Sequence, residues 1–380
     1  MQEDSKLIKL KNYEKIYALF FEDQSFSKPQ IAERLQLSMP TVMANITRLE
    51  KNGLIFKCEL FESSGGRPAT GYALVNDAKV AIGVEITKNT IHCAVIDLKG
   101  SICTQEFYKI PCSDSSKYFD KLCETINTFI SLQKYSSEQI LGIGISIQAI
   151  VDNASSEIIY SKIIPIKSLN SEELSKRLKY PVNIYHDVEC AATAELWFEE
   201  NISNAIYVSI GQHLGGALIQ NHHIEHGLKG YAGALEHLEV EENGKRCYCG
   251  RNGCLETYCS VSALLDGKYD IDEFFTKLRV AYPESEEAQK WDFYLRKLAK
   301  GLYTVYLLLE RDFILGGLIA PYLTQADIKK VESIIINRGS FNIEPGFIRI
   351  AKLQNNSVVI GSALNYIGSA LPKGLVKVVR

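Results

Sequence analysis

The chain has 380 residues, of which 46% are hydrophobic and 23% are charged, and its formal net charge is −3. This composition excludes a disordered chain, and the near-neutral charge does not by itself indicate a nucleic-acid partner. The length predicts two or three compact units. The N-terminus is polar and charged, and no apolar run is long enough to cross a bilayer, so the sequence predicts a protein of the reducing cytoplasm with no membrane partner.

Residues 10–75 have the pattern of a small helical head. Apolar residues at positions 13, 16, 17 and 20 predict an amphipathic first helix, and two further helices are predicted over residues 28–36 and 40–52. In the third helix, Val42, Ile46 and Leu49 form an apolar face. The neighbouring face is small, polar and basic, and consists of Thr41, Ala44, Asn45 and Arg48. Such a helix suits the major groove of DNA, although a plain helical bundle has the same pattern.

Two strands are predicted over residues 54–61 and 71–74, on either side of a turn that contains Gly66, Arg67 and Pro68. A narrow minor groove concentrates negative potential and accepts an arginine whose neighbours add little bulk. The turn is therefore predicted to contact DNA beside the third helix. A hairpin tip with a solvated arginine is the simpler alternative.

The segment from residue 233 to residue 260 is the hardest to explain by packing alone. It contains one imidazole and three thiols, at His237, Cys247, Cys249 and Cys254, which is a complete ligand set for one structural zinc ion. Gly250 and Gly253 suit the tight turns that bring the sulfurs together. Ordinary buried thiols or disulfide partners are the alternative, which a chain without a secretory signal makes less favourable.

These motifs resemble those of the ROK family of repressors and sugar kinases. Residues 247–256 match the family's Cys-x-Cys-Gly-x-x-Gly-Cys-Leu-Glu run at every defined position, and residues 65–68 match the Gly-Gly-Arg-Pro wing of ROK repressors. The resemblance implies an α/β fold, with a winged helix-turn-helix head and a two-lobed actin-like or hexokinase-like body. It places the DNA-binding head in residues 1–79, the first lobe in residues 80–186 and 355–380, and the second lobe, with the zinc site, in residues 187–354.

The phosphate-binding loops of ROK sugar kinases are altered in this chain. Residues 85–90 read Glu-Ile-Thr-Lys-Asn-Thr where the kinases have Asp-Ile-Gly-Gly-Thr-Lys, and residues 211–216 read Gly-Gln-His-Leu-Gly-Gly where the kinases have Gly-Thr-Gly-x-Gly-Gly. Side chains at the glycine positions are expected to block close approach of phosphates to the backbone. Gly316 and Gly317 alone keep the adenosine-side pattern. The resemblance and its departures therefore predict a body that is not an enzyme.

The sugar-binding motifs are partly kept. The resemblance implies a sugar or effector site formed by His186, Asp187, His237 and Glu256, with Asp187 in the position of the kinases' general base. A helix N-cap is the alternative role for Asp187. Other positions depart from the family, with Ala234 in place of a glutamate, Ile163 in place of an asparagine, and Gln148-Ala149 in place of Pro-Gly. The cleft is therefore expected to take a different sugar, to bind weakly, or to bind no sugar.

We therefore expect a ROK-type transcriptional regulator, a repressor of carbohydrate-utilisation genes, that binds double-stranded operator DNA as a homodimer and carries one structural zinc per chain. A sugar or sugar derivative between the lobes is expected to change the spacing of the two heads and so the affinity for DNA. Two alternatives stay open. One is a ROK sugar kinase with a fused DNA-binding head, and the other is a sugar-insensitive regulator that uses its body for dimerisation or for a protein partner.

Overall fold

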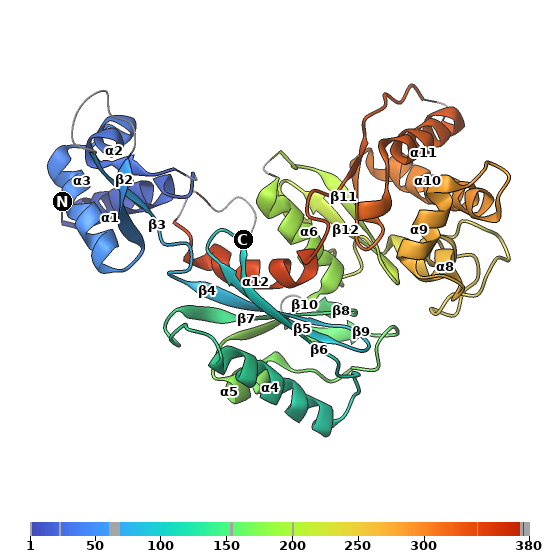
Figure 1. Cartoon of the computed structure of the whole chain (residues 1–380), viewed down its shortest axis with the longest axis horizontal. Coiled ribbons are helices and arrows are strands. Elements are labelled where there is room, and N and C mark those ends of the chain that lie inside the picture. Colours follow the sequence, from blue (N-terminus) through green and yellow to red (C-terminus); the bar gives the residue numbers. More distant parts are fainter. Residues whose placement is uncertain are drawn as a thin grey trace.

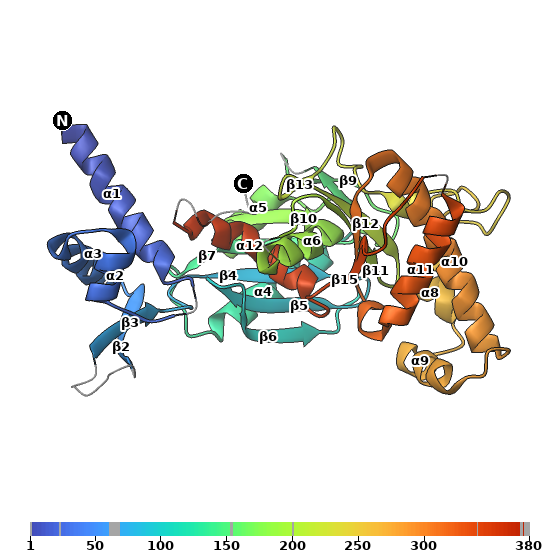
Figure 2. The ribbon, with the colours of Figure 1, turned by 90° about the horizontal axis from the view of Figure 1, so that it is seen from above.

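The computed structural model describes residues 2–22, 24–60, 69–152, 155–199, 201–339, 341–372 and 375. These residues form a head at the N-terminal end of the chain and two lobes, each of which contains a five-stranded sheet (Figure 1). The head and the second lobe lie at opposite ends of the molecule, with the first lobe between them (Figure 2). Among the described residues, no helix combines the length and the apolar character that a membrane span requires.

The head consists of three helices and a small sheet of strand order β1-β3-β2. Its elements are α1 (Gln2–Leu19), β1 (Phe26–Ser27), α2 (Lys28–Leu35), α3 (Met39–Lys51), β2 (Ile55–Leu60) and β3 (Ala69–Leu74). Helix α2 begins with a capping box, in which the Ser27 hydroxyl accepts the N–H of Gln30 and the Gln30 side chain accepts the N–H of Ser27. Ser38 caps α3 by accepting the N–H of Thr41. The two caps define where α2 and α3 begin.

The first lobe is built on a sheet of order β10-β7-β4-β5-β6. Its strands are β4 (Val80–Ile86), β5 (Ile91–Asp97), β6 (Ile102–Tyr108), β7 (Ile140–Ile147) and β10 (Val182–His186). Strands β4, β5 and β6 form an antiparallel meander, and β7 pairs in parallel with β4 and β10. One face of the sheet is covered by α4 (Ser116–Ser131) and α5 (Ser171–Leu178), while β8 (Ile150–Asp152) and β9 (Glu157–Tyr160) form a separate hairpin (Figure 1).

The second lobe has a sheet of order β13-β12-β11-β14-β15. Its strands are β11 (Ala205–Ile210), β12 (Leu214–Gln220), β13 (His223–Glu225), β14 (Asp312–Gly316) and β15 (Ile348–Ile350). The helical elements are η1 (Leu235–His237), α7 (Glu256–Cys259), α8 (Val261–Leu265), α9 (Ile271–Val280), α10 (Glu286–Leu309), η2 (Ala320–Tyr322) and α11 (Gln325–Arg338). Tyr294 and Leu298 of α10 are fully buried in one cluster with Phe313 of β14, so α10 is held by the core of this lobe.

Two helices, α6 (Asp187–Phe198) and α12 (Ser357–Ala370), pack together at the centre of the molecule (Figure 1). Helix α12 returns to the first sheet, as expected, and glycines allow its close approach. A Cβ on Gly83 would lie 2.0 Å from the Val359 carbonyl oxygen, and one on Gly361 would lie 1.8 Å from that of Cys190. Helix α12 therefore connects the first sheet to α6, the helix that leads into the second lobe.

The head is joined to the first lobe by a short connection that contains Asn76 and Asp77. The Asp77 carboxylate lies 2.7 Å from Lys134 Nζ and accepts the Tyr135 hydroxyl at 3.3 Å. The Asn76 carbonyl accepts the N–H of Leu98 at 2.9 Å. The predicted boundary between residues 79 and 80 falls in this connection. These bonds attach the head to the first lobe more firmly than a free linker would.

Candidate functional site

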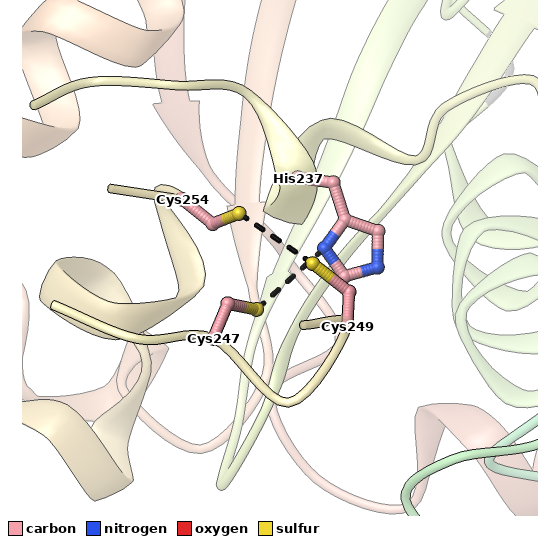
Figure 3. Close-up of side chains that lie close together, drawn as sticks. All are labelled: His237, Cys247, Cys249 and Cys254. Carbon is pink, nitrogen blue, oxygen red and sulfur yellow. Dashed lines mark hydrogen bonds between the residues drawn. The ribbon is translucent and has the colours of Figure 1, made fainter. Parts of the chain in front are cut away.

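His237, Cys247, Cys249 and Cys254 lie together, with the histidine on η1 and the cysteines on the loop that leads into α7 (Figure 3). Their ligand atoms are all within 4.8 Å of one another, with 3.8 Å between Cys247 Sγ and His237 Nδ1 and 3.7 Å between Cys249 Sγ and Cys254 Sγ. A tetrahedron with Zn–S bonds of about 2.3 Å has edges of about 3.8 Å, so these two separations are close to those of a tetrahedral zinc site. The sulfur atoms are too far apart for a disulfide bond of about 2.05 Å.

The backbone around the metal site depends on two glycines in the left-handed region. Gly250 has a φ of +97° and Gly253 a φ of +77°, and a Cβ on Gly253 would lie 1.8 Å from the Glu241 carbonyl oxygen. The Arg251 guanidinium donates a hydrogen bond to the His237 carbonyl at 2.9 Å. Burial lowers the pKa of His237, and Arg251 lowers it further. Both effects favour the neutral imidazole, which is the form that binds a metal.

A cavity of about 940 Å³ lies between the two lobes. The first lobe contributes Glu85 at the end of β4 and His186 at the end of β10, and α6 contributes its first residue, Asp187. The second lobe contributes His213, Glu236 and Tyr248. A ligand that contacts both sides of this cavity would favour one arrangement of the lobes over others.

Asp187 lines the cavity beside His186, as the sequence predicts. The His186 Nε2 atom lies 3.4 Å from Asp187 Oδ1. Asp187 accepts the N–H of Val188 at 2.9 Å, but His186 is the N-cap of α6, so the alternative role of Asp187 as an N-cap is wrong. Burial raises the pKa of Asp187; His186 partly opposes this shift and Glu85 adds to it.

Glu256 and His237 are placed differently from the expected effector contacts. Glu256 is 5% exposed, its Oε1 lies 2.7 Å from His213 Nδ1, and its Oε2 accepts the N–H of Leu214 at 2.7 Å. Both oxygens are therefore engaged within the protein, and neither Glu256 nor His237 is among the described residues that line the cavity. Glu256 instead holds His213, which does line it. Contact of Glu256 and His237 with an effector therefore stays a prediction.

His213, Glu236 and Tyr248 are among the cavity residues that the sequence analysis did not assign to the effector site. Tyr248 lies between two predicted metal ligands in the chain, and its ring packs edge-on against those of His213 and His237, with centroids 5.6 Å and 5.2 Å apart. The metal loop therefore delivers an aromatic side chain to the cavity. The sequence carried a signal for Tyr248, because a residue between two metal ligands has little freedom of position.

The two loops that correspond to the kinases' phosphate loops use their own side chains to bind backbone N–H groups. After β4, the Thr87 hydroxyl accepts the N–H groups of Asn89 and Thr90 at 3.4 Å and 3.2 Å. Before β12, the N–H of Leu214 is bound by Glu256. Three backbone donors in these loops are therefore already engaged. The pair Gly316 and Gly317 is explained by packing, because a Cβ on either would lie within 3 Å of Tyr207 or Ile210.

Helix α3 has the two faces that the sequence predicts. Val42, Ile46 and Leu49 are buried, Ala44 and Arg48 are exposed, and Thr41 and Asn45 are partly exposed. The Asn45 side chain donates to the Thr41 carbonyl at 2.8 Å, and the Thr41 hydroxyl lies 2.9 Å from that of Ser38. The Arg48 guanidinium lies 4.4 Å from the centre of the Tyr13 ring. These contacts hold the polar side chains at the surface of the head.

Two further points concern the predicted DNA-binding surface of the head. Met43 is 50% exposed on α3 and was not predicted, although an apolar side chain there suits contact with a thymine methyl group. Gly66, Arg67 and Pro68 lie outside the described residues, so their contact with DNA stays a prediction.

Together, the fold and the site define a two-lobed, kinase-like body with a histidine–cysteine metal cluster and a helical head. The chain belongs to the ROK family, whose model matches residues 81–367. The xylose repressor of Bacillus subtilis (strain 168) is 27% identical over 269 residues, which cover 69% of each chain. The DNA-binding transcriptional dual regulator NagC of Escherichia coli (strain K12) is 30% identical over 262 residues, which cover 68% of this chain and 64% of NagC.

Solved structures show the same fold. The crystal structure of a ROK family transcriptional regulator, a homologue of the E. coli MLC protein, matches with a TM-score of 0.73 and 21% identity over 97% of this chain and 98% of that one. A ROK family glucokinase from Streptomyces griseus, in complex with glucose and AMPPNP, matches with a TM-score of 0.63 and 20% identity over 75% of this chain and 98% of that one. The predicted α/β fold class with a two-lobed, kinase-like ROK body is confirmed, and the winged helix-turn-helix character of the head stays a prediction.

Proposed function

We propose that this protein is a DNA-binding transcriptional regulator that represses carbohydrate-utilisation genes, and that a sugar or sugar derivative in the inter-lobe cavity controls its binding to operator DNA. The observation that carries the proposal is a combination of two features. The head exposes one face of α3, while the body's loop N–H groups are engaged by Thr87 and Glu256. The relatives named as a xylose repressor and as NagC support the same conclusion.

The head would bind DNA with α3 in the major groove. Thr41, Ala44, Asn45 and Arg48 would face the bases and phosphates, and Arg67, with Gly66 and Pro68 on either side, would enter the adjacent minor groove. A homodimer would present two heads to two half-sites of one operator. Contacts with phosphates would make the affinity fall steeply with salt.

Arg48→Ala tests this arrangement. An arginine that contacts DNA is worth about 1–3 kcal/mol, so the variant is expected to weaken binding to a DNA site selected by the wild-type protein by roughly tenfold or more. Arg34→Ala is the matched control, because Arg34 lies on α2, also stacks on an aromatic ring, and pairs with Glu22. Fluorescence anisotropy at several salt concentrations measures the DNA affinity of both variants. Equal affinities for wild type and Arg48→Ala would contradict the role given to α3.

The body would act as a sensor rather than a kinase. Catalysis of phosphoryl transfer depends on positioned donors around the phosphates, and the donors contributed by the two loops are in part engaged within the protein. A coupled ATPase assay over hexoses, pentoses and amino sugars is expected to show no sugar-dependent turnover. Turnover that disappears in Asp187→Asn would instead establish the kinase alternative.

A zinc ion held by His237, Cys247, Cys249 and Cys254 would be structural. With all four positions filled by protein ligands, it would have no open position for a substrate. Its contribution would be to fix the loop that carries Tyr248 and the orientation of η1.

Thermal-shift screening with sugars separates a body that senses a sugar from a body used only for dimerisation or a protein partner. Stabilisation by one sugar is expected only of the sensing body.

A further inference from the structure

Glu236 is a buried carboxylate that the functions described so far leave unexplained. It is 9% exposed and lines the inter-lobe cavity, and its Oε2 atom is buried with no hydrogen-bond partner among the described residues. Its Oε1 atom lies 3.7 Å from Nε2 of His237, on the side of the ring opposite the metal-facing Nδ1. A buried polar atom without a partner costs free energy, so this oxygen is suited to a donor that arrives from outside the chain.

The geometry of η1 explains how Glu236 reaches the cavity. In a 3-10 helix, successive side chains point about 120° apart, so Leu235, Glu236 and His237 face three different directions. Leu235 enters the core, His237 faces the metal cluster, and Glu236 lines the cavity. The segment is held close to β12, because a Cβ on Gly216 would lie 2.3 Å from Leu235 Cδ2 and 2.5 Å from the Gly233 carbonyl oxygen.

The charges around Glu236 select the chemistry of a ligand. Asp187 and Glu85 line the same cavity as Glu236, and the basic side chains of Lys88 and Lys162 line it as well. A phosphate or carboxylate group has no proton to donate to the Glu236 oxygen at neutral pH. Hydroxyl and ammonium groups would be favoured because both donate hydrogen bonds to carboxylate oxygens.

We propose that Glu236 binds the effector directly, with Oε2 accepting a hydrogen bond from a hydroxyl or ammonium group of a polyhydroxylated ligand while Oε1 faces the metal-binding His237. This inference rests on the proposed sensing function and adds a contact at a position outside the predicted set. The chain has Ala234 where ROK kinases have a sugar-binding glutamate, and Ala234 is not among the described residues that line the cavity. Glu236 supplies a carboxylate to the cavity from a position two residues further along.

The test compares Glu236→Gln with the matched control Glu239→Gln, which changes an exposed glutamate on the other side of His237. Thermal shift and isothermal titration use glucose, mannose, galactose and xylose as hydroxyl donors, glucosamine as the ammonium donor, and glucuronate as the anionic probe. We expect a neutral sugar or glucosamine to bind the wild-type protein and Glu239→Gln equally, and to bind Glu236→Gln at least about tenfold more weakly. Glucuronate is expected to bind none of them.

Zinc content separates effector binding from a purely structural role. Both variants are expected to retain about one zinc per chain, because the four ligands are unchanged. Glu236→Asp provides a second variant, which keeps the carboxyl group but shortens the side chain by one methylene. It is also expected to lose affinity for the same sugar. Unchanged sugar affinity in Glu236→Gln, loss of zinc together with affinity, or no binding of any probe to the wild-type protein would each overturn the proposal. DNA affinity measured without sugar tests the regulator function independently.

Discussion

At the scale of single residues, the body differs from a phosphate-binding protein through side chains that engage backbone donors. Thr87 accepts two N–H groups of the turn after β4, at a position where the kinases have glycine. Glu256 accepts the N–H of Leu214 with one carboxylate oxygen, and its other oxygen is hydrogen-bonded to His213, which lines the cavity. A ligand phosphate would have to displace these internal bonds, and this is the physical reason for our proposal that the body does not act as a kinase.

Gly253→Ala is predicted to disrupt the metal loop. Gly253 combines a φ of +77° with a carbonyl oxygen 1.8 Å from the position of a Cβ, whereas Gly250 has a φ of +97° and open space around that position. Strain at such a backbone position costs about 1–3 kcal/mol, and the close contact adds to this for Gly253 alone. Gly253→Ala should therefore lower the melting temperature and the zinc content more than Gly250→Ala. Thermal denaturation and metal analysis measure both, and equal effects would argue against the contact.

At the scale of elements, the metal loop and η1 connect the metal cluster to the cavity. Cys247 and Cys249 flank Tyr248 in the chain, and His237 directly follows Glu236. Two residues that line the cavity are therefore next to residues of the cluster. Backbone hydrogen bonds hold this loop, including those from Val240 to Gly253 and from Leu255 to Leu238, both at 2.8 Å. A metal bound by the four residues would add to these bonds, so its removal would be expected to alter the cavity as well as the loop.

Cys249→Ser is predicted to lose zinc and to destabilise the second lobe by several kcal/mol, because one of the four ligands is removed. Cys103→Ser is the control, since Cys103 is exposed and lies on β6 of the other lobe. Mass spectrometry under native conditions counts the metal, and thermal denaturation with and without a chelator measures the stability. A Cys249→Ser protein that keeps zinc, or wild-type protein whose melting temperature is insensitive to the chelator, would show that the cluster is not a structural metal site.

At the scale of the whole molecule, the cavity and the head are connected through the first lobe. Glu85 and His186 reach the cavity from strands of the first sheet, and Asp77 ties the head to the same lobe through Lys134 and Tyr135. A ligand that draws the lobes together would therefore move the head with the first lobe. In a dimer this movement would change the distance between the two α3 helices and hence the fit to two half-sites.

Asp77→Ala is predicted to weaken the response of DNA binding to the effector more than DNA binding itself. The substitution removes the acceptor for Lys134 and Tyr135 and leaves the surface of α3 unchanged. The ratio of DNA dissociation constants with and without sugar should therefore move toward one. Glu124→Ala is the control, because Glu124 pairs with Lys121 on the exposed surface of α4. An unchanged ratio in Asp77→Ala would show that this connection does not carry the coupling.

The sequence by itself determined the local features of this protein. The apolar face of α3 and the two strands expected over residues 54–61 and 71–74 were predicted, because each depends on residues close together in the chain. The structure has these strands as β2 (Ile55–Leu60) and β3 (Ala69–Leu74), and periodicity and turn residues were enough to find them. The ROK resemblance then supplied the order of the lobes.

Tertiary structure alone decided which side chains meet in the cavity. Glu85, Asp187 and Glu236 are far apart in the chain, and burial and pairing depend on packing that no local pattern encodes. Glu256 was expected at the effector but has both oxygens bound within the protein, whereas Glu236 was overlooked and has an oxygen without a partner. The two carboxylates differ in function because of what surrounds each of them, and those surroundings exist only after the lobes have folded.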